Sequence, residues 1–338
     1  MTGKFRSFTL ILISIVIGCT LALILLEIMF RVSGYSPEKK EVLNIELLPD
    51  TSLFINDTLL GFKMNAGKYR LTYENGYEWS FSNNNNGYRQ SRTEDHIPYE
   101  LKFKNCWILG CSYTFGWSVN DEENFAYLLQ KAKSDWMIEN LGQPAYSTLQ
   151  SFLQLKRELN RNTPPDIVIL VYASFHDERN IGSVNWIRQL APYNELGDLS
   201  IPYVKSYDED SLRIRYKDVI YVSSWLANHS AAFTYIRSNI KAKAEFYKGT
   251  KVTARLIEHI HVLCQKYEID FKVAIINSNK TTADLYSILK INNIETFDFT
   301  IDSRKEGYTN EPFDSHPSAK AHQEISKDLI RLFELGSN

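Results

Sequence analysis

The sequence predicts an α/β protein with a central parallel β-sheet, preceded by an apolar N-terminal helix. From Asn105 onward, short apolar runs alternate with stretches of helical periodicity, and one run, Ile167 to Ala173 (IVILVYA), is apolar throughout. Such a run is typical of a central strand in a parallel sheet, because helices cover both of its faces. At the N-terminus, residues Phe8 to Leu26 contain no charged side chain.

The charge-free stretch predicts a membrane-spanning helix. It is 19 residues long, enough to cross a hydrocarbon core of roughly 30 Å. Lys4 and Arg6 precede it, and positive charge before a first span favours a cytoplasmic N-terminus. We therefore expect residues 1–7 in the cytoplasm, a signal anchor at 8–30, and the remaining chain outside the cytoplasm, in the periplasm or at the cell surface.

Two other interpretations of this stretch stay open. Val16-Ile17-Gly18-Cys19 is similar to a lipobox, in which Cys19 would carry the lipid, although the chain stays apolar for seven more positions. A cleaved signal peptide needs a shorter apolar core and a cleavage site between small residues, and neither is clear. An uncleaved anchor fits the pattern best.

Composition narrows the class of protein further. Of 338 residues, 44% are hydrophobic and 23% charged, as in ordinary globular proteins. Lys and Arg number 38 against 40 Asp and Glu, so no basic excess favours nucleic acid as a partner. Four cysteines are too few for a disulfide scaffold, and we expect Cys106 and Cys264 to be small buried hydrophobic residues.

Hydrophobic periodicity places the individual elements. We expect a polar, aromatic and Asn-rich approach segment at 31–101 and the catalytic domain at 102–335. The alternation predicts helices on both faces of the sheet, a three-layer sandwich whose ligands bind at the carboxyl ends of the strands. Strands are predicted at 106–110, 136–141, 167–173, 271–276 and 295–299, and helices at 124–133, 148–159, 252–267 and 317–335.

The stretch at about 182–249 fits the alternation poorly. It is rich in tyrosine and tryptophan, including Trp186, Tyr203 and Trp225. We interpret it as an insertion, either with a small core of its own or as a substrate-facing cap lined with aromatic rings.

Two short segments combine residue types that carry chemistry. Gly110-Cys111-Ser112-Tyr113-Thr114-Phe115-Gly116 follows the first predicted strand, and a serine in such a turn is either a nucleophile or part of a plain turn. Asp314 precedes His316 by two residues, so its carboxylate can orient the imidazole, or else cap a helix that begins at Pro317.

In combination, these segments resemble the SGNH/GDSL hydrolase family, in the membrane-anchored form found in bacteria. The resemblance covers about Leu60 to Leu332. The family's nucleophile block is similar to residues 110–116, its second block to Asn140-Leu141-Gly142, and its last block to Asp314-Ser315-His316-Pro317. Residues 60–62 (LGF) and 86–89 (NGYR) are similar to segments that precede the catalytic domain in such members.

The resemblance implies an SGNH-hydrolase-like, flavodoxin-like fold and a role for each matching residue. Ser112 would be the nucleophile, His316 the general base and then the general acid, and Asp314 the group that orients His316. The N–H groups of Ser112 and Gly142 would form the oxyanion hole.

The chain departs from the family pattern at two positions. Cys111 replaces the aspartate before the nucleophile, so a Cys111 nucleophile stays an alternative to Ser112. His176 stands where the family has an asparagine that donates to the oxyanion. Either the imidazole takes over that donor role, or His176 is a loop histidine bonded to a neighbour.

These observations predict a membrane-anchored serine esterase that hydrolyses or transfers an O-acyl group on an ester substrate, such as an acylated glycan or lipid of the cell envelope. The alternatives are a non-catalytic glycan-binding protein on the same fold and a polysaccharide O-acyltransferase that needs a donor partner. No cluster of residues has metal-ligand spacing, so we expect neither a metal nor another cofactor.

Overall fold

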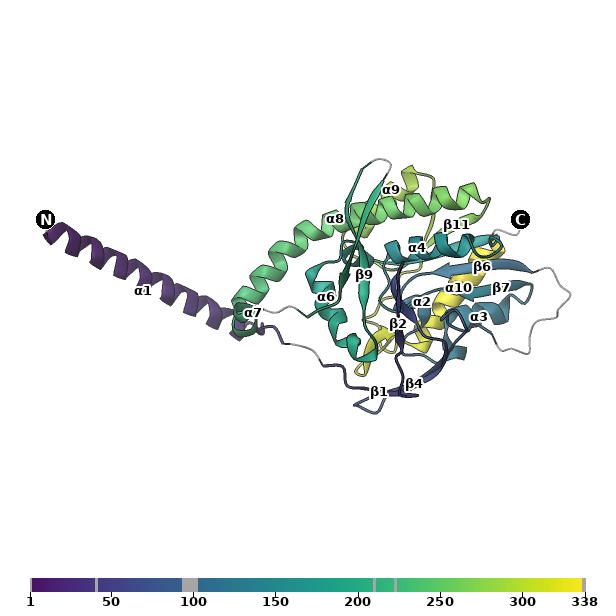
Figure 1. Ribbon diagram of the computed structural model, residues 1–338, viewed down its shortest axis with the longest axis horizontal. Helices are drawn as coiled ribbons and strands as arrows, with labels where there is room; N and C mark the ends of the chain where they lie inside the picture. Colours follow the sequence, from purple (N-terminus) through teal and green to yellow (C-terminus); the bar gives the residue numbers. More distant parts are fainter. Residues whose placement is uncertain (1, 40–41, 93–102, 209–210, 222–223, 336–338) are drawn as a thin grey trace. The chain divides into compact units, whose positions relative to one another are not determined.

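The computed structural model describes residues 2–39, 42–92, 103–208, 211–221 and 224–335 (Figure 1). The chain forms two compact units. The larger unit consists of Val42–Ile220 and Glu245–Asn338, and the smaller of Met1–Glu41 and Tyr221–Ala244. Each unit is described by itself.

A five-stranded sheet in the order β12-β11-β8-β6-β7 forms the centre of the larger unit. Every neighbouring pair in it is parallel. The prediction of a central parallel sheet is thus confirmed. The strands are β6 (Lys104–Leu109), β7 (Trp136–Asn140), β8 (Ile167–Ala173), β11 (Asp270–Asn277) and β12 (Glu295–Asp298).

Helices cover both faces of this sheet, which confirms the three-layer architecture. The side chains of β8 alternate between two cores: Val168 and Leu170 lie in one, and Ile167 and Ile169 in the other. The first core is closed by α4 (Thr148–Leu159), the second half of α8 (Ala231–Lys266) and α9 (Thr282–Ile291). The second core is closed by α3 (Phe125–Ala132) and α10 (Ala319–Leu335).

The stretch at 42–92 belongs to the larger unit and is built of antiparallel strands, although we expected an approach segment separate from the catalytic domain. The predicted boundary at 101–102 lies outside the described residues. One sheet has the order β1-β4-β5, and a hairpin pairs β2 with β3. The strands are β1 (Ile45–Leu48), β2 (Phe54–Asp57), β3 (Gly61–Met64), β4 (Gly67–Tyr73) and β5 (Glu78–Asn83).

The predicted insertion at 182–249 is divided between the two units. Residues 182–220, in which β9 and β10 form an antiparallel hairpin, and residues 245–249 lie in the larger unit, whereas 221–244 lie in the smaller unit. The elements are α6 (Val184–Leu190), η3 (Ala191–Leu196), β9 (Ser200–Tyr207), β10 (Leu212–Asp218), α7 (Trp225–His229) and the first half of α8.

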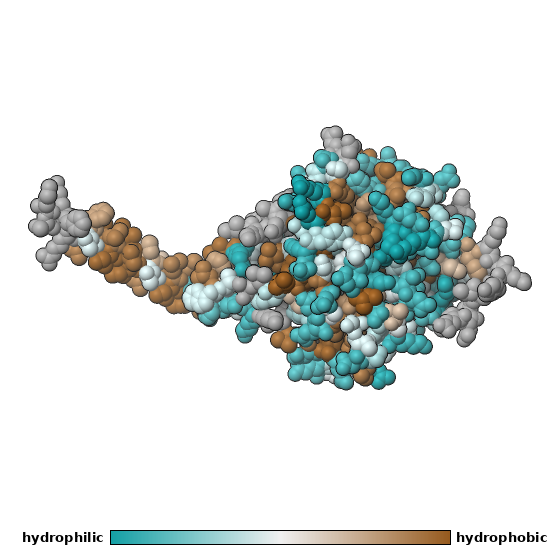
Figure 2. Space-filling view, viewed as in Figure 1, coloured by the Kyte–Doolittle hydropathy of each residue, from teal (hydrophilic) through white to brown (hydrophobic). Residues whose placement is uncertain are grey.

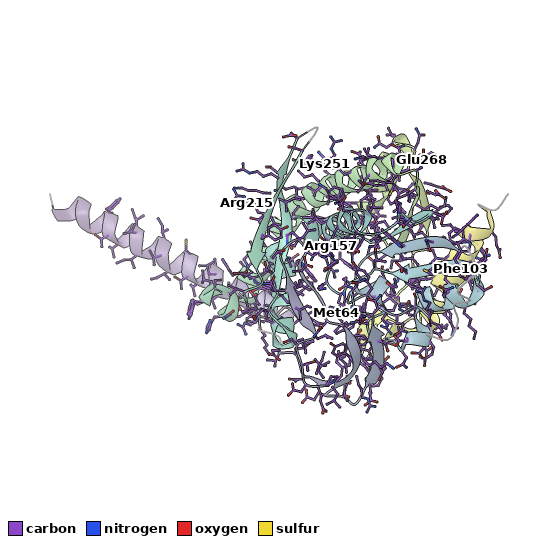
Figure 3. All side chains as sticks on the ribbon, turned by 45° about the vertical axis from the view of Figure 1, so that its right-hand side comes forward. Met64, Phe103, Arg157, Arg215, Lys251 and Glu268 are labelled. Atoms are coloured by element: carbon purple, nitrogen blue, oxygen red, sulfur yellow. The ribbon has the colours of Figure 1, made fainter. Side chains whose placement is uncertain are left out.

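The β2–β3 hairpin is bound to α4 and to the loop that follows β7. Arg157, labelled in Figure 3, lies on α4. It forms an ion pair of 2.6 Å with Asp57 at the end of β2. The main-chain N–H of Met64 donates to Gln143 Oε1 at 2.9 Å, and Gln143 Nε2 donates to the Gly87 carbonyl at 2.8 Å. The 42–92 stretch therefore supports the loop that begins with Gly142.

Arg89 binds the same stretch to the turn after the first sheet strand. Its side chain is fully buried and forms a 2.7 Å ion pair with Asp121. Its terminal nitrogens donate to the carbonyls of Phe115, Gly116 and Val119 at 3.2, 2.8 and 2.8 Å. Buried main-chain carbonyls need such donors, so Arg89 stabilises the course of residues 115–119.

The smaller unit contains the long N-terminal helix α1 (Thr2–Val32). Its segment Ser7–Val32 has a mean hydropathy of 2.8 in its most apolar part and is long and apolar enough to cross a membrane or to act as a signal anchor. Figure 2 shows hydrophobic residues along most of this helix. The expected N-terminal apolar helix is therefore present.

The Arg89→Met substitution tests the role of the buried guanidinium. It removes the ion pair and the donors to three carbonyls, and should lower the free energy of unfolding by about 3 kcal/mol. Urea unfolding of both proteins measures the difference. Arg304→Met removes an exposed ion pair and serves as the control without a measurable change. Equal effects of the two substitutions would contradict the stabilising role of the Arg89 guanidinium.

Candidate active site

The serine proposed as nucleophile lies at the start of a short helix after strand β6. This helix, α2 (Ser112–Phe115), ends at Gly116, whose φ of 80° is a left-handed conformation that favours glycine. A side chain at Gly116 would also collide with Asn124, since a Cβ there would lie 2.1 Å from Asn124 Nδ2. As Ser112 is the first residue of α2, its N–H has no acceptor within the helix.

The structure brings Ser112, His316 and Asp314 together. His316 Nε2 lies 3.0 Å from Ser112 Oγ, and His316 Nδ1 lies 2.7 Å from Asp314 Oδ1. The main-chain N–H of His316 also donates to Asp314 Oδ1, at 2.8 Å. His316 and Asp314 belong to β14 (Asp314–Pro317), which pairs with β13 (Thr309–Asn310). The carboxylate, imidazole and hydroxyl thus form a continuous chain of contacts.

A tyrosine that the sequence analysis missed completes the surroundings of Asp314. Tyr73, at the end of β4, donates its hydroxyl to Asp314 Oδ2 at 2.9 Å, and Trp117 Nε1 donates to Tyr73 at 2.8 Å. No sequence signal connects residues 241 positions apart. Burial alone would raise the pKa of Asp314, but His316 and the hydrogen bonds to the carboxylate lower it to about 2. Asp314 is therefore an anion at neutral pH.

Gly142 lies against the nucleophile helix. A Cβ at this position would lie 2.6 Å from Thr114 Cβ and 2.7 Å from the main-chain nitrogen of Phe115, so only glycine allows this approach. Its N–H, predicted as an oxyanion donor, donates to Asn140 Oδ1 at 3.0 Å. An oxyanion bound to this N–H would have to share it with Asn140 Oδ1 or displace that acceptor. The oxyanion role of Gly142 therefore stays a prediction.

Cys111 is fully buried, with no exposed surface. Burial raises the pKa of its thiol, although the nearby Arg179 guanidinium acts in the opposite direction. A protonated, enclosed thiol is a poor nucleophile. The contact with His316 is made by Ser112, so the geometry favours Ser112 over Cys111.

Arg179 is a second residue that the sequence analysis missed, because the run His176-Asp177-Glu178-Arg179 is typical of an exposed turn. Its guanidinium carbon lies 4.2 Å from the centre of the Phe175 ring and 4.0 Å from that of Trp186. Only 9% of its surface is exposed. In the part of the chain that the structure describes, it forms no ion pair with a carboxylate. Its Nη1 donates to the Tyr146 carbonyl at 2.9 Å, and the guanidinium lies beside Cys111.

His176 lies on α5 (His176–Asn180) and is fully buried. Its Nδ1 lies 3.3 Å from Thr148 Oγ1. Burial, and then the charge of Arg179, hold its pKa well below the usual range, so the ring is neutral. An enclosed ring that contacts Thr148 matches the second interpretation, a histidine bonded to a neighbour. The oxyanion role expected from the family pattern receives no support from this geometry.

The chain was compared with known proteins. No protein-family model matches it, and no curated protein matches it at a significant level. Among solved structures, it is similar to a member of the lipolytic protein G-D-S-L family from Veillonella parvula DSM 2008, at 11% identity and a TM-score of 0.39, over 68% of this chain and 98% of that one.

Two further solved structures are similar. One is an SGNH-hydrolase family esterase, at 11% identity and a TM-score of 0.35, over 70% of this chain and 98% of that one. The other is a carbohydrate esterase whose active site is described as having divergent catalytic and non-catalytic binding functions, at 9% identity and a TM-score of 0.40, over 87% and 98%. At such identities these likenesses concern the fold alone.

Substitution of His176 separates a structural role from a donor role. His176→Ala should create a cavity and lower the free energy of unfolding by about 2–4 kcal/mol, while kcat for a chromogenic short-chain ester stays near the wild-type value well below the unfolding temperature. Thermal unfolding and steady-state kinetics measure both effects. A fall in kcat of about 10²-fold at unchanged KM and unchanged stability would instead restore the oxyanion role.

The low pKa of Asp314 predicts a pH-dependent stability. A depressed carboxylate pKa stabilises the folded state above the unfolded-state value of 3.8, and this contribution is lost as the pH falls toward about 2. At pH 6 the wild-type protein should exceed Asp314→Asn by about 2 kcal/mol in free energy of unfolding. The two should converge near the folded-state pKa, as measured by urea titration. Asp135→Asn, at an exposed position, is the control, and a gap that persists at low pH would refute the assignment.

Proposed function

We propose that this chain is a membrane-anchored serine esterase that hydrolyses or transfers an O-acyl group. One observation carries the proposal: Ser112 Oγ lies 3.0 Å from His316 Nε2, while His316 Nδ1 lies 2.7 Å from Asp314 Oδ1. A hydroxyl, an imidazole and a carboxylate at these distances have the geometry that nucleophilic catalysis on an ester requires.

Each member of this arrangement has a chemical task in the proposed reaction. Ser112 Oγ attacks the ester carbonyl as His316 Nε2 accepts its proton, and the tetrahedral intermediate then expels the alcohol, which takes that proton from His316. Water, or an acceptor hydroxyl in the transfer reaction, attacks the resulting acyl-enzyme by the same route in reverse. Asp314 keeps the proton on Nδ1 and stabilises the imidazolium.

Negative charge on the tetrahedral intermediate needs stabilisation near Ser112. The N–H of Ser112, unpaired within α2, is one donor at hand. The Arg179 cation adds a positive potential beside Cys111, the residue that precedes the nucleophile. In a buried environment such a charge acts more strongly than in water.

The proposed location is a cell membrane, with a single pass through α1 and the larger unit outside the cytoplasm. The length and hydropathy of Ser7–Val32 and the basic residues Lys4 and Arg6 support this topology. We favour an acylated glycan or lipid of the cell envelope as substrate, because an anchored enzyme on that side meets such esters.

Three substitutions test the function. Ser112→Ala and His316→Ala should each lower kcat/KM for a chromogenic short-chain ester by on the order of 10⁴-fold or more, because the members act as a unit. Cys111→Ala is the matched control next to the nucleophile and should keep most of the activity. A fluorophosphonate should label Ser112, as located by mass spectrometry.

Two results would contradict the proposal. If Cys111→Ala is inactive while Ser112→Ala is active, the nucleophile is the cysteine. If the wild-type chain neither turns over esters nor reacts with the fluorophosphonate, the non-catalytic alternative holds. Transfer to an added acceptor sugar, measured on the products, separates acyl transfer from hydrolysis.

A further inference from the structure

The smaller unit exposes two large apolar side chains on the short helix α7. Trp225 is 72% exposed and Leu226 is 50% exposed, whereas the next residue, Ala227, is buried. The Trp225 ring stacks on His229, with centroids 4.8 Å apart and an interplanar angle of 20°. Exposure of a tryptophan and a leucine side chain to water is unfavourable, because burial of their apolar surface would lower the free energy.

The start of α8, directly after α7, is fixed to the end of α1 by hydrogen bonds that Glu27 accepts. The Glu27 carboxylate accepts from Ser230 Oγ at 2.7 Å and from the main-chain N–H groups of Ala231 and Ala232 at 2.9 and 3.1 Å. A carboxylate at a helix N-terminus satisfies donors that have no partner within the helix. α1 thus supplies the N-terminal cap of α8.

Arg31 attaches α7 itself to the same level of α1. Its Nη2 donates to the His229 carbonyl at 2.9 Å, and its Nε donates to Glu27 at 2.7 Å. Glu27 and Arg31 are the first charged residues after the charge-free stretch Phe8 to Leu26. Helix α7 therefore lies beside the point along α1 at which the charge-free stretch ends.

Aromatic rings make a second contact at this point along α1. Phe30 of α1 lies 5.6 Å from Tyr35 and 4.7 Å from Tyr235 of α8, and the two tyrosines lie 4.7 Å apart, measured between ring centroids. Tyrosine and tryptophan are enriched where a membrane protein passes from hydrocarbon to water. The smaller unit has the composition of such a boundary.

We propose that Trp225 and Leu226 insert into the headgroup–acyl boundary of the membrane that α1 spans, as a second lipid contact beside the helix. This inference rests on the proposed anchoring by α1. Leu23, Leu25 and Met29 of α1 are exposed as well, as expected of residues that face lipid. A second copy of the chain is a poor occupant, because a stable interface buries roughly 800 Å² per partner and this surface consists of two side chains.

The second contact has a geometric consequence for the smaller unit. A single spanning helix is free to tilt in the bilayer in any direction. With α7 held against one side of α1 and inserted at the boundary, a tilt away from that side would lift Trp225 and Leu226 toward water, and a tilt toward it would push the charged Glu27–Arg31 pair deeper. The contact therefore restricts the tilt of α1.

Quenching by brominated lipid tests the proposal. The full-length chain is placed in vesicles of phosphatidylcholine, with or without bromine near the carboxyl end of the acyl chain, and tryptophan emission is compared. Trp225 is one of six tryptophans, so a difference between variants identifies it. The bromine-dependent quenching should disappear in Trp225→Phe and persist in Trp136→Phe, the matched control in the larger unit.

The outcomes separate this inference from the anchoring on which it rests. Alkaline carbonate extraction reports whether α1 holds the chain in the bilayer, and extraction of the wild-type chain would overturn both. Retention in the bilayer, with quenching that Trp225→Phe leaves unchanged, would overturn the second lipid contact alone. If the emission of Trp225 changes with the density of protein in the vesicles and not with bromine, a second copy covers it, and this result would also overturn the proposal.

Discussion

The arrangement of the candidate site depends on one buried guanidinium. Arg89 donates to the carbonyls of Phe115, Gly116 and Val119, which belong to the end of the nucleophile helix and the turn after it. Asn124 Nδ2 also donates to the Phe115 carbonyl at 3.0 Å, but the charge-assisted hydrogen bonds from Arg89 are stronger. The ion pair with Asp121 compensates the charge of Arg89. The position of Ser112 follows from this anchor, because α2 is only one turn long.

The same N-terminal stretch of the larger unit reaches each part of the site. Through Tyr73 it contacts the carboxylate of Asp314, and through Met64 and Gly87 it holds the side chain of Gln143, next to Gly142. The parallel sheet brings the strand ends together, but the distances between the functional groups depend on these added contacts. Residues 42–92 therefore support the candidate site.

Sequence patterns predicted the parts of the fold in which burial alone decides the structure. The boundaries of β8 and α4 agree with the predicted 167–173 and 148–159, because an apolar run and a helical stripe are local signals. The first half of α8 was missed, although Phe233, Ile236, Ile240, Ala244 and Tyr247 recur at helical spacing, because the stretch was interpreted as an insertion and the predicted helix began at Val252. The strands at 42–92 were also missed, although β2 pairs with β3 and β4 with β5 across short turns.

In the candidate site, too, the sequence predicted residues that carry a local signal and missed those that matter only through tertiary contacts. Ser112, Asp314 and His316 carry motifs, and the structure places them within hydrogen-bonding distance. Tyr73 and Arg179 have no motif, because their importance comes from tertiary contacts alone. For His176 the family position left two roles open, and the structure encloses the ring beside Thr148.

The burial of the cysteines would have a consequence in the oxidising compartment proposed for the larger unit. Cys106, Cys111 and Cys264 are unpaired and enclosed, as the sequence predicted for Cys106 and Cys264. Oxidants and thiol reagents reach such sulfurs only when the surrounding structure opens, so their reaction rate follows the population of open states. The three thiols thus act as internal reporters of opening. Each brief opening, however, exposes a sulfur that irreversible oxidation would then trap outside the core.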